Sequence, residues 1–134
     1  MNKVRFSMMS AVTATMAAVA FSMSSAIAAT IEDGVYTVEQ AEEGKELFER
    51  RCSACHNADF YRVALSNRNT QPLSWIFEEI LVTMPADVPG SLTDPEYEAI
   101  MAQILQLTGY PAGDEPLNYA NGSMDSISVV PPSS

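Results

Sequence analysis

The chain is 134 residues long and carries 17 acidic against seven basic residues, a formal charge of −10 at pH 7. This length is typical of one small domain, and the negative charge argues against binding to nucleic acid or to an anionic membrane, since both attract basic surfaces. Two cysteines and one histidine are too few for a structural zinc site, which takes about four such ligands.

Residues 1–28 have the pattern of a secretory signal peptide. Lys3 and Arg5 form a short basic region, an uncharged apolar stretch follows, and Ala26 and Ala28 give a small-x-small cleavage site. The alternative is a retained membrane anchor, but the apolar core is short against the roughly 20 residues that a membrane span needs. We expect cleavage after Ala28 and release into the periplasm of a chain with formal charge −12.

The remainder predicts helices and no convincing strand, and therefore an all-α fold. The first helix is expected to begin at Thr37, with Gln40 as its capping-box partner, and to end near Cys52. Glutamates in its early turns and arginines near its end suit the helix dipole.

The segment at the end of this helix contains both cysteines and the one histidine of the sequence: Cys52, Cys55 and His56. Cys-x-x-Cys-His is the attachment motif of a c-type haem. Each thiol can form a thioether to a haem vinyl group, and the histidine is then the proximal iron ligand. The alternatives are a small structural disulfide and a redox dithiol, although the latter wants a βαβ context that is not visible. The motif predicts one covalently bound haem c.

Three residues that follow the motif in the sequence are candidates for the haem environment. Arg62 and Arg68 can pair with haem propionates, or they are solvated surface arginines. A second helix is expected from about Ser74 to Val82, with Trp75 on its buried side. There Trp75 either borders the haem or fills the core.

Met84 is the expected distal iron ligand. It precedes Pro85, which disfavours helical backbone at the residue before it, so Met84 should lie in an extended loop. Met101 falls on the apolar stripe of the last helix and Met124 in a polar tail, and the other five methionines lie in the signal region. A neutral thioether favours ferrous iron and raises the reduction potential. The alternative is an open distal face.

The last helix is expected from Asp94 to Leu107, begun by a capping box of Thr93 and Glu96 and ended at Gly109. No periodicity follows it. The expected organisation is therefore a signal peptide (1–28), one domain (29–113) and an irregular C-terminal tail (114–134).

The chain resembles a class I cytochrome c from about Thr37 to Gly113. The residues that carry this resemblance are Gly44 and Phe48, the Cys-x-x-Cys-His motif, Met84-Pro85 and the last helix. Residues 84–94, 96–97 and 109–113 more narrowly resemble small monohaem cytochromes associated with periplasmic quinoprotein (PQQ-dependent) dehydrogenases.

The resemblance implies that Cys52 and Cys55 carry the thioethers and that His56 and Met84 are the axial ligands. It also implies that Gly44 and Phe48 lie where the first helix crosses the last. The sequence departs from this pattern twice. Gln103 stands where many relatives have an aromatic residue. The Gly-Pro-x-Leu segment whose proline carbonyl accepts the histidine N–H is missing, and Pro72 is the nearest substitute.

We therefore expect a soluble, monomeric electron carrier and not an enzyme. By resemblance, it passes single electrons from a dehydrogenase to an oxidase or another cytochrome, and its charge suits redox partners with basic docking patches. One alternative is a haem-based sensor or small peroxidase-like enzyme with a displaceable distal ligand. The other is a cytochrome subunit docked permanently in a dehydrogenase complex.

Overall fold

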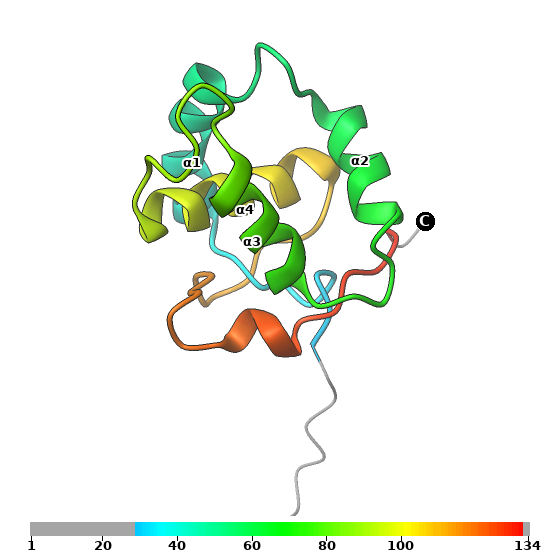
Figure 1. Cartoon of the computed structure of the whole chain (residues 1–134). Coiled ribbons are helices and arrows are strands. Elements are labelled where there is room, and N and C mark those ends of the chain that lie inside the picture. The colour runs from blue at the N-terminus through cyan, green and yellow to red at the C-terminus, as the bar shows by residue number, and fades with distance from the viewer. Residues whose placement is uncertain (1–28, 133–134) are drawn as a thin grey trace, which may run out of the picture.

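The computed structural model describes residues 29–132, and the predicted signal peptide lies outside this range. Four α-helices and one 3-10 helix make up its regular structure (Figure 1). They are α1 (Val38–Arg51), α2 (Ala58–Ser66), α3 (Leu73–Thr83), α4 (Asp94–Thr108) and η1 (Ser123–Ser126). Across the described range, β-pairing is limited to two isolated bridges, so the all-α prediction is confirmed. No helix within these residues is long and apolar enough to cross a membrane.

The crossing of α1 and α4 forms the centre of the fold. A Cβ atom on Gly44 would lie 1.9 Å from the carbonyl oxygen of Ala99, so only glycine allows the two backbones to come this close. Phe48 is buried one turn later and packs in one cluster with Ile100 and Ile104. The two residues expected at the helix crossing therefore lie there.

The helix starts show which capping predictions hold. Thr37 caps α1 by accepting the Gln40 N–H at 3.2 Å, but the Gln40 side chain does not complete the expected capping box. Its amide instead donates to the Leu117 carbonyl and accepts the Leu117 N–H, both at 2.9 Å. The box of Thr93 and Glu96 at the start of α4 is confirmed.

Helix α3 matches the prediction within one residue at each end, but its buried face differs. Trp75 was expected on the buried side and is 56% exposed. Ile76 is buried as expected, but Phe77 is buried in place of Trp75, and the centroid of the Phe77 ring lies 4.7 Å from that of Tyr119 in the tail. The tail therefore packs against the face of α3 that carries Phe77.

The C-terminal segment is largely irregular, yet it is part of the core. It runs past α3 towards the end of α2 (orange to red in Figure 1). It contributes four buried apolar side chains to the main hydrophobic cluster: Leu117, Met124, Ile127 and Val129. The Ile127 carbonyl accepts the Leu73 N–H at 2.8 Å, so the tail also holds the first residue of α3.

Candidate functional site

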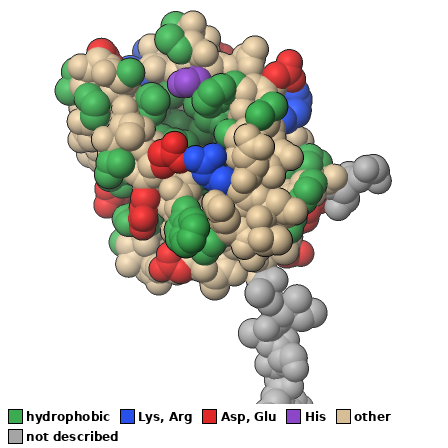
Figure 2. Space-filling model, turned by 45° about the vertical axis from the view of Figure 1, so that its right-hand side comes forward, with side chains coloured by type: hydrophobic (Ala, Val, Ile, Leu, Met, Phe, Trp, Pro, Cys, Tyr) green, Lys and Arg blue, Asp and Glu red, His purple; other side chains and the backbone are tan. Residues whose placement is uncertain are grey.

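A pocket with about 450 Å3 of empty space, partly open to solvent, lies between α2, α3 and the haem-motif segment. Figure 2 shows a hollow lined mainly by hydrophobic side chains, with the histidine at its rim and a basic and an acidic side chain at another edge. The lining residues are His56, Phe60, Tyr61, Ala64, Arg68, Ile76, Glu79, Ile80, Thr83 and Met84.

A tight turn after α1 presents the two cysteines beside this pocket. The Cys52 N–H donates to the Phe48 carbonyl at 2.8 Å, and the Cys52 carbonyl accepts the N–H groups of Cys55 at 3.1 Å and His56 at 2.9 Å. Both thiols are free, Cys52 partly buried and Cys55 exposed. Burial raises the pKa of the Cys52 thiol, and the Arg51 guanidinium offsets part of that rise.

The His56 ring is oriented by aromatic packing. Its centroid lies 4.3 Å from that of Phe60 and 5.6 Å from that of Tyr61, both on α2. Its Nδ1 is buried and has no hydrogen-bond partner among residues 29–132. The Pro72 carbonyl does not provide one, and it accepts the Trp75 N–H at 3.2 Å.

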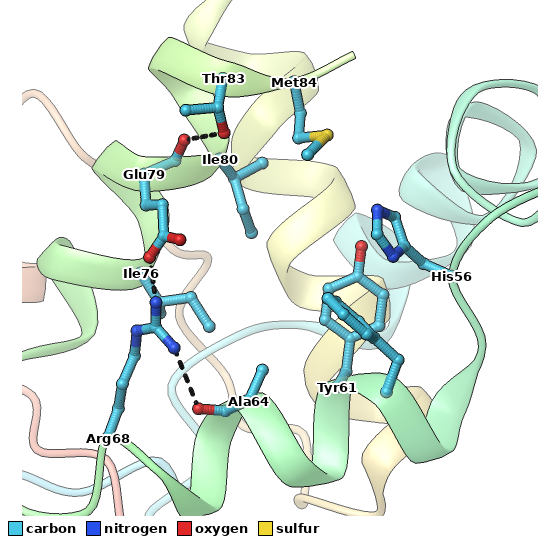
Figure 3. Close-up of a pocket in the computed structure, with 10 residues that line it drawn as sticks. His56, Tyr61, Ala64, Arg68, Ile76, Glu79, Ile80, Thr83 and Met84 are labelled. Atoms are coloured by element: carbon cyan, nitrogen blue, oxygen red, sulfur yellow. Dashed lines mark hydrogen bonds and ion pairs between the residues drawn. The ribbon is translucent and has the colours of Figure 1, made fainter. Parts of the chain in front are cut away.

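Met84 ends α3 and faces His56 across the pocket (Figure 3). Its backbone is extended, with φ −122° and ψ 154°, as the following proline predicts. The other two methionines within the described range are fully buried in the main core. Met84 is therefore the methionine that the fold brings to the pocket.

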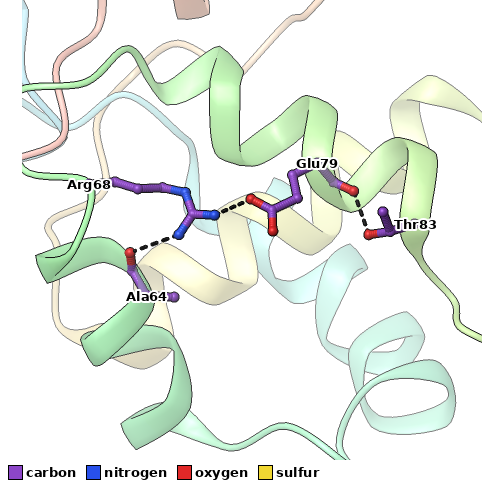
Figure 4. A network of polar contacts seen from close by, with 4 residues as sticks. All are labelled: Ala64, Arg68, Glu79 and Thr83. Atoms are coloured by element: carbon purple, nitrogen blue, oxygen red, sulfur yellow. Dashed lines mark hydrogen bonds and ion pairs between the residues drawn. The ribbon is translucent and has the colours of Figure 1, made fainter.

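Arg68 and Glu79 form an ion pair that links α2 to α3 along the edge of the pocket (Figure 4). The Arg68 guanidinium also donates to the Ala64 carbonyl at 3.3 Å, and Thr83 Oγ1 donates to the Glu79 carbonyl at 2.6 Å. Arg68 thus lies where the prediction put a haem-environment residue.

The other two tentative residues are not brought to this pocket. Arg62 pairs with Asp59 on the exposed side of α2. Trp75 is not among the pocket-lining residues and is more than half exposed. The structure therefore groups Arg68 with the two expected ligands and leaves Arg62 and Trp75 apart.

Several lining residues were missed because the sequence analysis assigned no helix to residues 58–66. A signal was present: Asn57 caps α2 by accepting the Phe60 N–H at 2.9 Å, and asparagine is a preferred cap. Phe60 and Ala64 are spaced four apart, and so are Tyr61 and Leu65. Helical spacing of this kind predicts a common face.

The residues of the pocket fit a haem. An imidazole and a thioether face the same space from opposite sides, two thiols lie in the adjoining turn, and most of the wall is apolar. No group of three or more His, Cys, Asp or Glu within the described range could hold a bare metal ion. The donor set is thus suited to iron that arrives within a porphyrin, which itself supplies the equatorial ligands.

Comparison with known proteins agrees with this geometry. Residues 39–104 match the family model described as "Cytochrome C oxidase, cbb3-type, subunit III". The matched range includes the haem motif, Met84 and most of α4. No curated protein and no solved structure gives a significant match to the chain. The matched family and the all-helical fold support a class I cytochrome c domain, and this domain implies covalently bound haem c.

Proposed function

We propose that this chain, with its class I cytochrome c domain, is a periplasmic carrier of single electrons from a dehydrogenase to an oxidase or another cytochrome. The domain itself indicates an electron-transfer protein. The observation that carries the proposal is the placement of Met84 opposite His56 across one apolar pocket. A site closed by a protein ligand on both sides suits electron transfer better than binding of an exogenous ligand.

The residues of the site have separate roles in this proposal. Cys52 and Cys55 would hold the haem by thioethers, and His56 and Met84 would be the axial iron ligands. When bound, the haem supplies a one-electron ferric/ferrous couple. The Met84 thioether favours the ferrous state and raises the potential, and the apolar walls act in the same direction by disfavouring the extra positive charge of ferric iron.

The proposed donor and acceptor rest on two resemblances. The resemblance to cytochromes associated with quinoprotein dehydrogenases supports a periplasmic dehydrogenase as the donor. The matched family is described by an oxidase subunit, which supports an oxidase as the acceptor. Arg68 is the candidate to pair with a haem propionate, because it lines the pocket.

The proposal predicts how two of the three methionines of residues 29–132 respond to mutation. Purified ferrous protein should be low-spin and should not bind carbon monoxide at neutral pH. Met84→Ala should remove a protein ligand, admit carbon monoxide and lower the reduction potential. Met124→Leu, in a core site that is 1% exposed, is the matched control and should leave the iron spectrum unchanged.

Haem attachment is tested in the same preparation. Because thioethers are covalent, the haem should stay with the polypeptide in acid acetone. A wild-type protein that binds carbon monoxide readily would contradict the electron-carrier proposal and favour a sensor or peroxidase-like enzyme. Quantitative loss of the haem into the solvent would contradict covalent attachment.

A further inference from the structure

The backbone of Met84 is held by contacts from two other parts of the chain. Its carbonyl oxygen accepts the Tyr97 hydroxyl at 2.7 Å and the Gly90 N–H at 3.2 Å. Its own N–H donates to the Ile80 carbonyl at 2.9 Å. Each peptide group adjoining the Met84 Cα therefore has a partner, and this limits the directions that the side chain can take into the pocket.

The Tyr97 contact is the one that comes from a different helix. Tyr97 lies in the first turns of α4 and is 2% exposed. Its N–H donates to the Thr93 carbonyl at 3.0 Å, where the capping box fixes the helix start. Both the backbone and the ring of Tyr97 are thus held in place. Its hydroxyl therefore has little freedom to follow a displacement of the Met84 backbone.

We propose that Tyr97 is a positioning residue for Met84: its hydroxyl sets the place from which the distal thioether reaches the iron. This inference rests on the proposed function, because it takes Met84 as the axial ligand. It extends that function by assigning control of distal ligation to the start of α4, a helix that contributes no residue to the pocket lining.

The chain offers a matched control for this hydrogen bond. The Tyr36 hydroxyl donates to the Tyr110 carbonyl, also at 2.7 Å, and Tyr36 is 1% exposed. Neither Tyr36 nor Tyr110 lines the pocket. Tyr97→Phe and Tyr36→Phe each remove one hydroxyl from a buried ring and one donor from a backbone carbonyl, and phenylalanine keeps the ring packing in both.

The experiment measures imidazole binding to the ferric holoprotein, since imidazole competes with a weak axial thioether. We expect Tyr97→Phe to bind imidazole roughly three- to tenfold more tightly than wild type, because a typical hydrogen bond contributes to ligation by a factor of this size. The charge-transfer absorption of the methionine–ferric bond should weaken in parallel. Tyr36→Phe should match wild type in both readouts while losing a comparable part of its stability to urea.

The possible results separate this inference from the proposed function. If wild type shows methionine ligation and the two variants bind imidazole equally tightly, Tyr97 has no positioning role and the electron-carrier proposal stands. If wild type itself lacks methionine ligation, the proposed function fails at its distal ligand. Should Tyr97→Phe not fold, Tyr97→Leu, which keeps an apolar side chain and has no donor, provides the second variant, and unchanged ligation there overturns the inference.

Discussion

Three buried tyrosines tie distant parts of this small protein together through their hydroxyl groups. Each donates to a backbone carbonyl: Tyr36 to Tyr110 at 2.7 Å, Tyr97 to Met84 at 2.7 Å, and Tyr110 to Val130 at 2.6 Å. A buried hydroxyl without a partner would destabilise the fold. These bonds therefore hold the segment before α1, the backbone at Met84 and the C-terminal tail against α4 and against Tyr110 just beyond its end.

Tyr36 gives a test of this role through pH. Burial raises its pKa above the ordinary value of about 10, because the phenolate loses its hydration in the interior. As pH rises through about 10, the unfolded chain releases this proton before the folded protein does. The folded state then binds more protons, so the free energy of unfolding falls with increasing pH.

Tyr36→Phe should lower the free energy of unfolding at pH 7 by about 1 kcal/mol, the contribution of one hydrogen bond. The variant cannot titrate at this position, so its deficit against wild type should shrink above pH 10. Urea unfolding at pH 7 and pH 11 measures both differences. A deficit that stays constant or grows at high pH would contradict the raised pKa of Tyr36.

At the scale of elements, local signals were sufficient for α1, α3 and α4. Their ends are marked by Thr37, Pro85, Thr93 and Gly109. Residues that start or stop a helix act within a few positions of themselves in the sequence. The haem motif and Met84 were found in the same way, because each has a distinctive neighbourhood in the sequence. Met84 and His56 both line the pocket, whereas iron ligation itself stays a prediction.

The features that were missed depend on contacts between segments far apart in sequence. Gln40 binds the tail and not its own helix end because Leu117 offers both a carbonyl and an N–H. Trp75 is exposed because Phe77 and the Tyr119 ring occupy the buried side of α3. The spacing of apolar residues shows that a helix has a buried face, but the partner of that face decides which residues lie on it.

The α1–α4 crossing provides a prediction at this scale. Gly44→Ala would place a methyl group 1.9 Å from the Ala99 carbonyl oxygen, and both atoms belong to helices that must separate to relieve the overlap. We expect a loss of about 1–3 kcal/mol in the free energy of unfolding, despite the better helix propensity of alanine. Lys45→Ala, at the next and exposed position of α1, should change it by less than about 0.5 kcal/mol. Equal unfolding midpoints for the two variants in urea would contradict the close approach.

At the scale of the whole molecule, the tail closes the fold around the pocket. It binds α1 through Gln40, stacks on α3 through Tyr119 and accepts the N–H of Leu73 at the start of α3. One wall of the pocket is α3, so the tail supports that wall from the far side. No sequence pattern indicates this role, since the four buried apolar residues of the tail are scattered among polar ones without a regular period.

The charge of the molecule is uncompensated over much of its surface. Residues 29–134 contain five basic side chains against 17 acidic ones. Four of the five, all arginines, already pair with carboxylates: Arg50, Arg51, Arg62 and Arg68. Most acidic groups therefore contribute to a long-range negative field, which attracts cationic partners at low ionic strength.

This field predicts opposite salt responses for redox partners of opposite charge. The rate constant for electron transfer with a basic cytochrome c should fall as ionic strength rises from about 0.01 to 0.15 M, because the screening length shortens from about 30 to 8 Å. The rate constant with ferricyanide, an anion, should rise over the same range because repulsion is screened. Stopped-flow absorbance of the haem measures both. If both rate constants are independent of salt, the acidic residues serve solubility and the docking contact is an apolar rim around the pocket, whereas opposite slopes would support a basic docking patch on the physiological partner.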